Sequence, residues 1–494
     1  MTNNSIYPVD TNSDLCTGCN RCVRECPMET ANITYQDEAG NIKVKIDHDK
    51  CIACGWCVSS CKHEARRFRD DTERFFDDLK NGANISVIAA PAIRTNIPEY
   101  ENLFTFLKQQ GVKKIFDVSL GADICVWAHI RHLENTGFAP IITQPCPVIV
   151  MYCEKYRHDL LKWLSPVQSP MACASVYMKQ YIGIEDQIAA LSPCIAKTNE
   201  FAETNLAQYN ITFTGLLEYI KNNGITLPEI KTAFDHGNSG LGSLFPMPGG
   251  LKENLEYFTG RKLHISKSEG SGVYEKLDAY AQTDEASLPT VFDVLNCEEG
   301  CNIGSASLRK KNFFEIEKIM HDARKKVGEE RDKRTGTVLY PKYDETLSLS
   351  HFMREYRPKD IPFAEITDED IEKAFAVLGK HDQKKQNVDC SACGSETCHH
   401  MARKIALNVN IPVNCIVKAM EDAKAEHEEN IAAHKQLVEM ERIHEVDERT
   451  RIMLDATPLG AHFWDENFNI VDCNLASVNL FKMSSKKEYM EKYF

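Results

Sequence analysis

The sequence lacks the features that are typical of membrane proteins and of proteins that bind nucleic acids. None of its apolar runs approaches the length of a membrane span, and its start, MTNNSIYPVDTNSD, has neither the basic nor the apolar region of a secretion signal. Positive charge is also scarce, because 72 acidic residues outnumber 58 Lys and Arg and give a formal net charge of −14. We therefore expect a cytoplasmic protein that binds neither membranes nor nucleic acids.

Cysteine, by contrast, is abundant, with 20 among the 494 residues. Many cysteines without an export signal argue for metal ligation rather than for disulfides. The length is typical of three or four domains. The composition thus favours an iron-rich, multidomain protein of an anaerobic or microaerobic cell.

Two near-copies of one cysteine motif, CTGCNRCVRECP and CIACGWCVSSC, occupy residues 16–61. In the bacterial two-cluster spacing, the fourth cysteine of each run binds the other cluster. We therefore predict a ferredoxin-like domain with two [4Fe–4S] clusters. Their ligands would be Cys16, Cys19, Cys22 and Cys61 for one cluster, and Cys51, Cys54, Cys57 and Cys26 for the other. A pair of zinc sites is the alternative, but three closely spaced thiolates in each run suit a cubane better.

From Ile85 the sequence predicts an α/β domain with parallel strands. The apolar runs ISVIAAP, KIFDVS, APIIT, QIAALS and TVFDVL are typical of buried strands, and helical patterns lie between them. Three loops, TQPCP, LSPCIAK and VLNCEEGC, each follow one of these strands and carry Cys146, Cys194, Cys297 and Cys301. Because open α/β sheets build ligand sites at the carboxyl ends of their strands, we expect these thiols to lie there.

A further cysteine-rich segment begins after a predicted helix at 365–380, for which Thr367 and Asp370 form a capping pair. The segment DCSACGSETCHHMARKIALNVNIPVNC resembles a small [4Fe–4S] module found in several redox proteins. Its candidate ligands are Cys390, Cys393, Cys398 and Cys415. A four-cysteine zinc site is the alternative.

The last part of the sequence predicts a connection to a sensor domain. Residues 419–450 are charged and helix-prone, without Gly or Pro, which favours a linker helix or short coiled coil that would pair two copies of the chain. Residues 451–494 resemble the opening of an α+β PAS domain, with two strands around a turn at 465–467 and then a helix. They would make up about half of such a domain.

The three cysteine loops resemble, in order and local spacing, the signatures that hold the H-cluster of iron-only ([FeFe]) hydrogenases. The resemblance runs over about residues 85–313. It implies a [4Fe–4S] cubane joined to a two-iron unit with carbonyl, cyanide and azadithiolate ligands. By this resemblance Cys146, Cys194 and Cys297 would bind the cubane, and Cys301 would bind it and bridge to the two-iron unit.

The resemblance also assigns residues around the two-iron unit. Lys197 stands at the place of a lysine that hydrogen-bonds a cyanide, and a fixed ammonium beside an anionic ligand is chemically reasonable. Ala90, Pro91, Ser169 and Pro170 match segments that lie near the cluster. For each of these residues alone, a packing role is the alternative.

The proton route departs from the family pattern. In catalytic members a cysteine of the first loop carries protons to the two-iron unit, whereas Pro145 stands here, without a titratable group or a backbone N–H. Two carboxylates farther along the route would fall at His129 and His132, and Ser165 keeps its place. The predicted ligands of the cluster are therefore all present, whereas the predicted proton route has other residues than in catalytic members.

Other positions also differ from the family or have no ligand spacing. Two methionines that normally pack against the cluster fall at Ser192 and Leu295. We interpret the cysteines outside the ligand sets as small buried hydrophobes, as free cysteines usually are; they are Cys125, Cys153, Cys173 and Cys473.

Together these features favour a slow, hydrogen-sensing iron-only hydrogenase of the ferredoxin type. A lost relay that raises the barrier by a few kcal/mol costs about 100-fold or more in rate. The implied partners are H₂, protons, ferredoxin or another redox protein, and the hydrogenase maturation proteins.

The domain order resembles the sensory group, with a ferredoxin-like domain (1–80), an H-cluster domain (81–360), a four-cysteine module (361–418), a linker helix (419–450) and a PAS-like start (451–494).

Two alternatives stay open. The first is a ferredoxin-dependent catalytic hydrogenase with a modified proton path through His129 and His132, which the turnover rate would distinguish. The second is an electron-transfer iron–sulfur protein that holds cubanes and no H-cluster. Infrared bands of carbonyl and cyanide ligands would exclude this second alternative.

Overall fold

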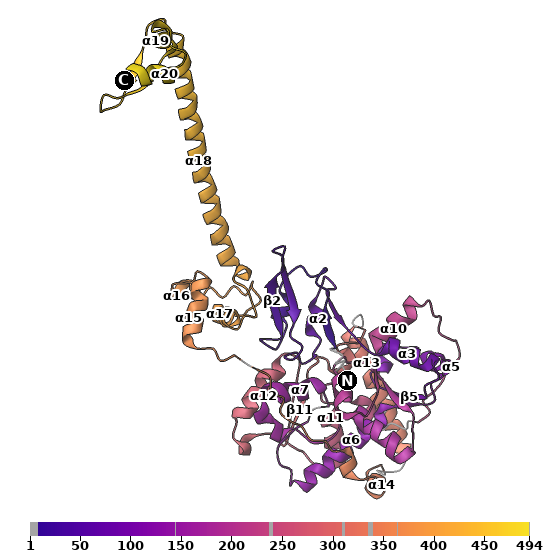
Figure 1. Ribbon diagram of the computed structural model, residues 1–494. Coiled ribbons are helices and arrows are strands. Elements are labelled where there is room, and N and C mark those ends of the chain that lie inside the picture. The colour runs from indigo at the N-terminus through magenta and orange to yellow at the C-terminus, as the bar shows by residue number, and fades with distance from the viewer. Residues whose placement is uncertain are drawn as a thin grey trace. The chain divides into compact units, whose positions relative to one another are not determined.

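The chain divides into two units, Met1–Pro412 and Val413–Phe494. The structure is a computed structural model that describes residues 8–143, 145–236, 241–308, 312–333, 339–362 and 364–493 (Figure 1). In this described part, no helix combines the length and apolar character needed to cross a bilayer.

The first unit begins with two pairs of antiparallel strands around the two cysteine runs. The paired strands are β1 (Val9–Thr11) with β4 (Arg66–Phe68) and β2 (Asn32–Gln36) with β3 (Ile42–Ile46). Each cysteine run contains one short helix, α1 (Arg21–Arg24) or α2 (Trp56–Ser60). A small apolar core that includes Val9, Val23 and Val44 lies between them.

Among the described residues, seven parallel strands follow and form two sheets. The first sheet has the order β6-β5-β8-β9, with β5 (Ile85–Ala89), β6 (Ile115–Asp117), β8 (Gln187–Ser192) and β9 (Tyr209–Thr212). The second has the order β10-β11-β7, with β7 (Ile141–Thr143), β10 (Ile265–Glu269) and β11 (Val291–Leu295). The predicted α/β fold with parallel strands is confirmed, but the sequence did not show that the strands divide into two sheets.

Helices alternate with these strands. They are α3 (Thr72–Lys80), α4 (Ile93–Asn96), α5 (Tyr100–Gln109), α6 (Val118–Asn135), α7 (Pro147–Tyr156), α8 (Pro170–Tyr177), α9 (Lys197–Thr204), α10 (Phe213–Asn222), α11 (Gly250–Thr259), α12 (Gly272–Gln282), α13 (Phe313–Lys333) and α14 (Leu339–Thr346). In the first sheet, β5 is buried along its whole length, and the side chains of Phe75, Phe104 and Phe213 pack into the same apolar core. Burial on both faces explains why these strands are continuous apolar runs rather than alternating ones.

The unit ends with α15 (Asp368–Val377), α16 (Gln383–Gln386) and α17 (Cys398–Ala406). Helix α15 has the predicted capping box of Thr367 and Asp370, although it is shorter than the range 365–380. Helix α17 and the residues after it contact the ferredoxin-like region. The Arg403 Nε donates to Glu29 Oε2 at 3.0 Å, and the Thr34 amide donates to the Val409 carbonyl at 3.0 Å.

The second unit consists of one long helix and a small α+β element. Helix α18 (Ile416–Asp455) is 40 residues long, so it extends past the predicted range 419–450. Strands β12 (His462–Trp464) and β13 (Ile470–Cys473) pair antiparallel and are followed by α19 (Leu475–Leu480) and α20 (Lys486–Tyr493). Two strands around a turn and then a helix is the order that the sequence predicts for the start of a PAS domain.

Candidate metal centre

Four cysteines from three loops line one cavity of the first unit, namely Cys146, Cys194, Cys297 and Cys301. Each loop leaves the carboxyl end of a parallel strand, because Cys146 follows β7, Cys194 follows β8 and Cys297 follows β11. Strands β7 and β11 are neighbours in one sheet, whereas β8 belongs to the other. The cavity therefore lies where the carboxyl ends of the two sheets meet.

The cavity favours neutral thiols until a cation binds. Burial, together with the charge of neighbouring thiols, raises the pKa of Cys194 to about 11 and that of Cys301 to about 12. The pKa of Cys297 is well above its ordinary value for the same two reasons. Thiolate ligands are deprotonated by the metal that they bind, and sulfur donors select soft metals such as those of iron–sulfur clusters. This donor set fits a buried cluster.

Two glycines press the third cysteine loop against the other parts of the site. A Cβ on Gly300, whose φ is +70°, would lie 2.3 Å from the carbonyl oxygen of Pro246. A Cβ on Gly304 would lie 2.4 Å from the carbonyl oxygen of Pro193, the residue before Cys194. Because no real Cβ tolerates such distances, both positions require glycine, and they fix Cys301 between its neighbours.

The wall of the cavity is mostly apolar and includes several residues that the sequence assigned to it. Ala90, Pro91 and Pro170 line the cavity, and so do Pro145 and Leu295. Small and rigid side chains of this kind exclude water from the space beside the cysteines. The roles of these residues toward a cluster stay predictions.

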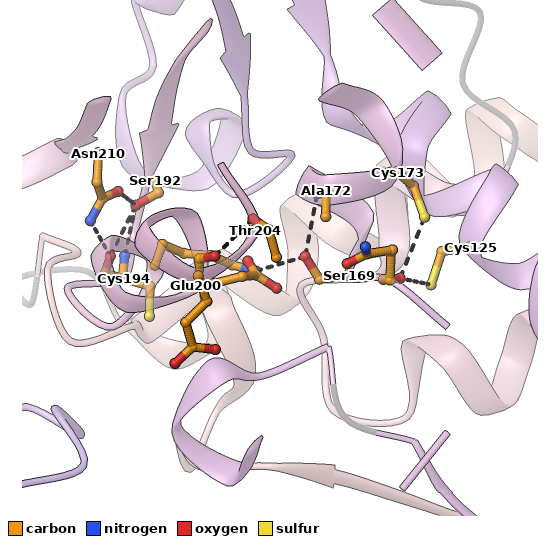
Figure 2. A network of polar contacts seen from close by, with 12 residues as sticks. Cys125, Ser169, Ala172, Cys173, Ser192, Cys194, Glu200, Thr204 and Asn210 are labelled. Atoms are coloured by element: carbon orange, nitrogen blue, oxygen red, sulfur yellow. Dashed lines mark hydrogen bonds and ion pairs between the residues drawn. The ribbon is translucent and has the colours of Figure 1, made fainter. Parts of the chain in front are cut away.

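Lys197 is the charged residue of the lining, and it is held from two sides. Its side chain is 9% exposed, and its Nζ donates to Ser169 Oγ at 3.0 Å and forms an ion pair with Glu200, one turn later on α9 (Figure 2). An ammonium has three donors, so Lys197 can hold both partners and still donate into the cavity. The sequence analysis missed Glu200, although its spacing of three residues from Lys197 is a helical pair.

A polar network holds the second cysteine loop. Ser192 Oγ donates to Asn210 Oδ1 at 2.6 Å and accepts from the Cys194 amide at 3.3 Å, and Asn210 Nδ2 donates to the Cys194 carbonyl at 3.0 Å (Figure 2). The resemblance predicts a methionine position at Ser192. In this structure Ser192 holds the backbone of the Cys194 loop. Asn210, on β9, was not found from the sequence because it lies 16 residues after Cys194.

The residues of the predicted proton route lie in two places. His129 and His132 share α6, one turn apart, with His129 buried and His132 half-buried. Burial, followed by the charge of His129, lowers the pKa of His132. Ser165 is buried after the 3₁₀ turn His158–Trp163, where its Oγ accepts from the Val167 amide at 3.3 Å.

Cys125 and Cys173 are buried, as expected, but they are more than small hydrophobes. Cys125 Sγ lies 3.6 Å from His129 Nδ1. Both thiols donate to the Gln168 carbonyl, at 3.3 Å from Cys125 and 3.4 Å from Cys173 (Figure 2). Burial acts to raise the pKa of Cys125, but the hydrogen bond with Cys173 and the charge of His129 lower it overall. The Cys-x-x-x-His spacing on a helix could have indicated this pair.

Cysteines from both ferredoxin-like runs share one cavity, and their ligand roles stay predictions. Cys26 of the first run lines one small cavity together with Cys51, Cys54 and Cys57 of the second. Cys54 also lines the cavity of the four loop cysteines, so the two sites are adjacent. Within the described part of the chain, no three His, Cys, Asp or Glu side chains are placed to hold a single metal ion.

The other predicted ferredoxin-like ligands are Cys16, Cys19, Cys22 and Cys61, of which Cys22 is buried. A basic residue that the sequence analysis missed lies next to this set. Arg66 is 5% exposed, and its guanidinium donates to Cys22 Sγ at 3.2 Å and to Asn32 Oδ1 at 2.7 Å. Burial raises the pKa of Cys22, and the charge of Arg66 opposes this increase.

The candidate ligands of the third predicted cluster do not all belong to one unit. Its first three candidate ligands, Cys390, Cys393 and Cys398, belong to the first unit, whereas Cys415 precedes α18 in the second. The Cys398 amide donates to Asp389 Oδ1 at 2.6 Å, which fixes the start of α17. His399 packs edge-on against Phe375, in keeping with a role outside the ligand set.

Comparison with known proteins matches the two recognisable regions separately. Residues 83–316 match the family "Iron only hydrogenase large subunit, C-terminal domain", and residues 15–65 match the family "4Fe-4S dicluster domain". Iron hydrogenase 1 of Clostridium pasteurianum is 26% identical over 279 residues, which are 48% of this chain. The chain spans about half the length of this curated relative, 49%.

Solved [FeFe]-hydrogenases are also similar in structure. One, from a study of oxygen inactivation of the H-cluster, is 19% identical with a TM-score of 0.45 and covers 59% of this chain and 100% of its own. A variant of HydA1 from Chlamydomonas reinhardtii is 18% identical with a TM-score of 0.43 and covers 59% of this chain and 99% of its own. From these matches, residues 83–316 belong to the iron-only ([FeFe]) hydrogenase family, and a 4Fe-4S dicluster domain precedes them.

Proposed function

We propose that the chain is a hydrogen-sensing iron-only hydrogenase that interconverts H₂ with protons and electrons slowly. The observation that carries this proposal is the cavity where the four loop cysteines meet beside the buried Lys197. Four thiolates on three loops can hold a cubane, and Cys301 can also bridge to a second metal unit. When bound, such an H-cluster supplies the metal at which H₂ is split or formed.

The residues of the cavity would bind and orient this cluster. Ser169 and Glu200 fix the Lys197 ammonium, so its third donor can hold an anionic ligand such as cyanide at a set position. Ala90 and Pro91 would keep water away from the neutral carbonyl ligands. We expect loading of the site to need hydrogenase maturation proteins or a synthetic two-iron cofactor.

The neighbouring cysteines support a path for electrons. Cys54 belongs to the lining of two cavities, so a cubane on Cys26, Cys51, Cys54 and Cys57 would lie beside the H-cluster. Ferredoxin or another redox protein would exchange electrons with the ferredoxin-like region. The contact between Arg403 and Glu29 supports a further connection, from this region to the module that carries Cys390, Cys393 and Cys398.

The slow rate and the sensory role rest on two features. Pro145 lines the cavity where catalytic relatives have a proton-carrying cysteine, and a proline cannot carry protons. The second unit has a 40-residue helix before the strands β12 and β13, which supports signal output through a PAS-like domain. Exposed apolar side chains on α18, such as Ile431, Val438 and Ile443, support pairing of two copies of the chain in the cytoplasm.

H₂ oxidation and evolution by the protein matured with a synthetic two-iron cofactor test this proposal. We expect slow turnover in the parent and faster turnover in Pro145→Cys. A variant that adds His129→Glu and His132→Glu to Pro145→Cys shows whether the outer route also limits the rate. A fast parent with no gain in either variant would contradict the slow sensor.

That outcome would favour a ferredoxin-dependent catalytic hydrogenase with a modified proton path. One observation supports this second candidate: His129 and His132 are neighbours on α6, with one of them buried and the other partly exposed. Histidine carries protons well near neutral pH.

A further inference from the structure

One face of α6 leads from the cavity wall toward the surface. Val118 and Ala122 line the cavity, and Cys125, His129 and His132 follow at intervals of three or four residues, which places all five on the same face of the helix. Exposure rises along this face, from 1% at Cys125 and 3% at His129 to the half-buried His132. The distance along the axis from Ala122 to His132 is about 15 Å, at 1.5 Å per residue.

The two inner groups of this face are in contact. His129 Nδ1 lies 2.8 Å from the Cys125 carbonyl oxygen, which can only accept, so Nδ1 carries the proton and points toward Cys125 Sγ at 3.6 Å. The other ring nitrogen, His129 Nε2, is buried and has no hydrogen-bond partner among the described residues. Burying a polar atom without a hydrogen bond costs free energy of folding, so such an atom calls for an explanation. Here Nε2 is free to accept a proton that passes along the helix face.

Charged and titratable groups surround the pair. Cys173 on α8 shares the Gln168 carbonyl with Cys125, and Lys197 on α9 adds a positive charge near both thiols. Asp293 on β11 interacts electrostatically with His129. Asp293 is 4% exposed, and burial raises the pKa of its carboxyl group to about 6. These neighbours provide charge of both signs around an otherwise apolar helix face.

We propose that Cys125 and His129 form an internal proton carrier that takes over the part of the thiol missing at Pro145, with His132 as the exit to solvent. This inference rests on the proposed function, because it needs a cluster that consumes and releases protons. Gln168, which accepts from Cys125, lies two residues before Pro170 of the cavity wall, and Cys125 itself follows the wall residue Ala122 by three positions on α6.

The step is a proton transfer without electron transfer. For a proton that moves inward, the Cys125 thiol first gives its proton to the cavity side and becomes a thiolate. The Nδ1–H bond of His129 then breaks as an S–H bond forms again on Cys125, and His132 releases a proton to His129 Nε2, so that His129 stays neutral. A turn of the imidazole ring brings its N–H back to the side of Cys125 before the next proton moves. For H₂ oxidation the same bonds form and break in the reverse order.

Infrared spectra of the S–H stretch test the pair without any turnover. The protein is prepared with its cubanes and without the two-iron unit, so that 16 of the 20 cysteines are predicted ligands and do not contribute. The difference between the parent and Cys125→Ala should show one S–H band that shifts in His129→Gln and stays unchanged in Cys153→Ala, a buried cysteine on α7. A band that His129→Gln does not move would overturn the proposal.

Turnover of the matured protein supplies the second readout. Cys125→Ala, the near-isosteric Cys125→Ser and His129→Gln should each slow H₂ turnover about tenfold or more and change its solvent isotope effect, because serine is a far weaker acid than cysteine. Cys153→Ala should stay within about twofold of the parent. Parent-like rates in all three variants, with carbonyl and cyanide bands present, would overturn the proton carrier alone. Absence of those bands in the parent would instead overturn the proposed function.

Discussion

Lys197 donates to Ser169 Oγ across 3.0 Å and is paired with the buried carboxylate of Glu200. A buried ion pair that loses one partner leaves an uncompensated charge, which costs about 3 kcal/mol or more. Lys197→Met should therefore lower the free energy of unfolding by about that amount. The same variant should fail to retain a two-iron unit, because an anionic ligand loses its cationic partner. Thermal unfolding and infrared spectra measure the two effects.

The double variant Lys197→Met with Glu200→Gln separates stability from binding. It removes both charges, so most of the lost stability should return, while retention of the two-iron unit should not. If the double variant retained the unit as the parent does, Lys197 would be a structural residue only.

Gly300 is the residue that lets the third loop approach Pro246. Gly300→Ala would place a Cβ 2.3 Å from a backbone oxygen at a positive φ, so the loop that carries Cys301 must shift. We expect loss of one cubane, about four irons per chain, while the ferredoxin-like clusters stay. Gly272→Ala is the matched control, because nothing lies within 4 Å of its Cβ. An iron content equal in both variants would contradict the assigned role of this loop.

Arg66 should tune one ferredoxin-like cluster. Its guanidinium donates to Cys22 Sγ, and hydrogen bonds and positive charge near the ligand sulfurs raise the reduction potential of a cluster. Arg66→Gln should lower the potential of the cluster on Cys16, Cys19, Cys22 and Cys61 in a redox titration followed by electron paramagnetic resonance. Arg69→Gln changes an exposed arginine nearby and should leave the potential unchanged. Equal reduction potentials in the parent and in Arg66→Gln would contradict the assignment of Cys22 as a ligand of this cluster.

Cys301 should be necessary for retention of the two-iron unit. Cys301→Ser should prevent its retention while the ferredoxin-like clusters remain, because the neighbouring Glu298 and Glu299 offer only hard oxygen donors. The measurement is iron content together with infrared spectra after maturation. Carbonyl bands of normal strength in this variant would show that Cys301 is not the bridge.

The sequence predicted the parts of the site that depend on local spacing. The loops that carry Cys146, Cys194 and Cys297 follow strands that were visible as apolar runs, and the structure places them at the ends of β7, β8 and β11. The division of these strands between two sheets was not predictable, because strand order depends on pairings far apart in the chain. Strands β9 and β10 were missed, and β10 has a polar pattern, ISKSE, that does not suggest burial.

Contacts between residues far apart in the chain were also not predictable from the sequence. Asn210 holds the Cys194 loop from another strand, and Arg66 reaches Cys22 across 44 residues. The pair of Cys125 and His129 lies within one helix, so its spacing was visible, but its meaning depends on Gln168 and Cys173, which only the fold brings to it.

Infrared spectroscopy of the protein matured with a synthetic two-iron cofactor tests the assignment of the cavity most directly. We predict bands of bound carbonyl and cyanide in the parent, together with about sixteen irons in the four cubanes, at about four irons each. Without maturation the protein should contain its cubanes but have no activity toward H₂. Filled cubanes without carbonyl and cyanide bands, under conditions that mature an authentic hydrogenase, would contradict an H-cluster and leave an electron-transfer protein.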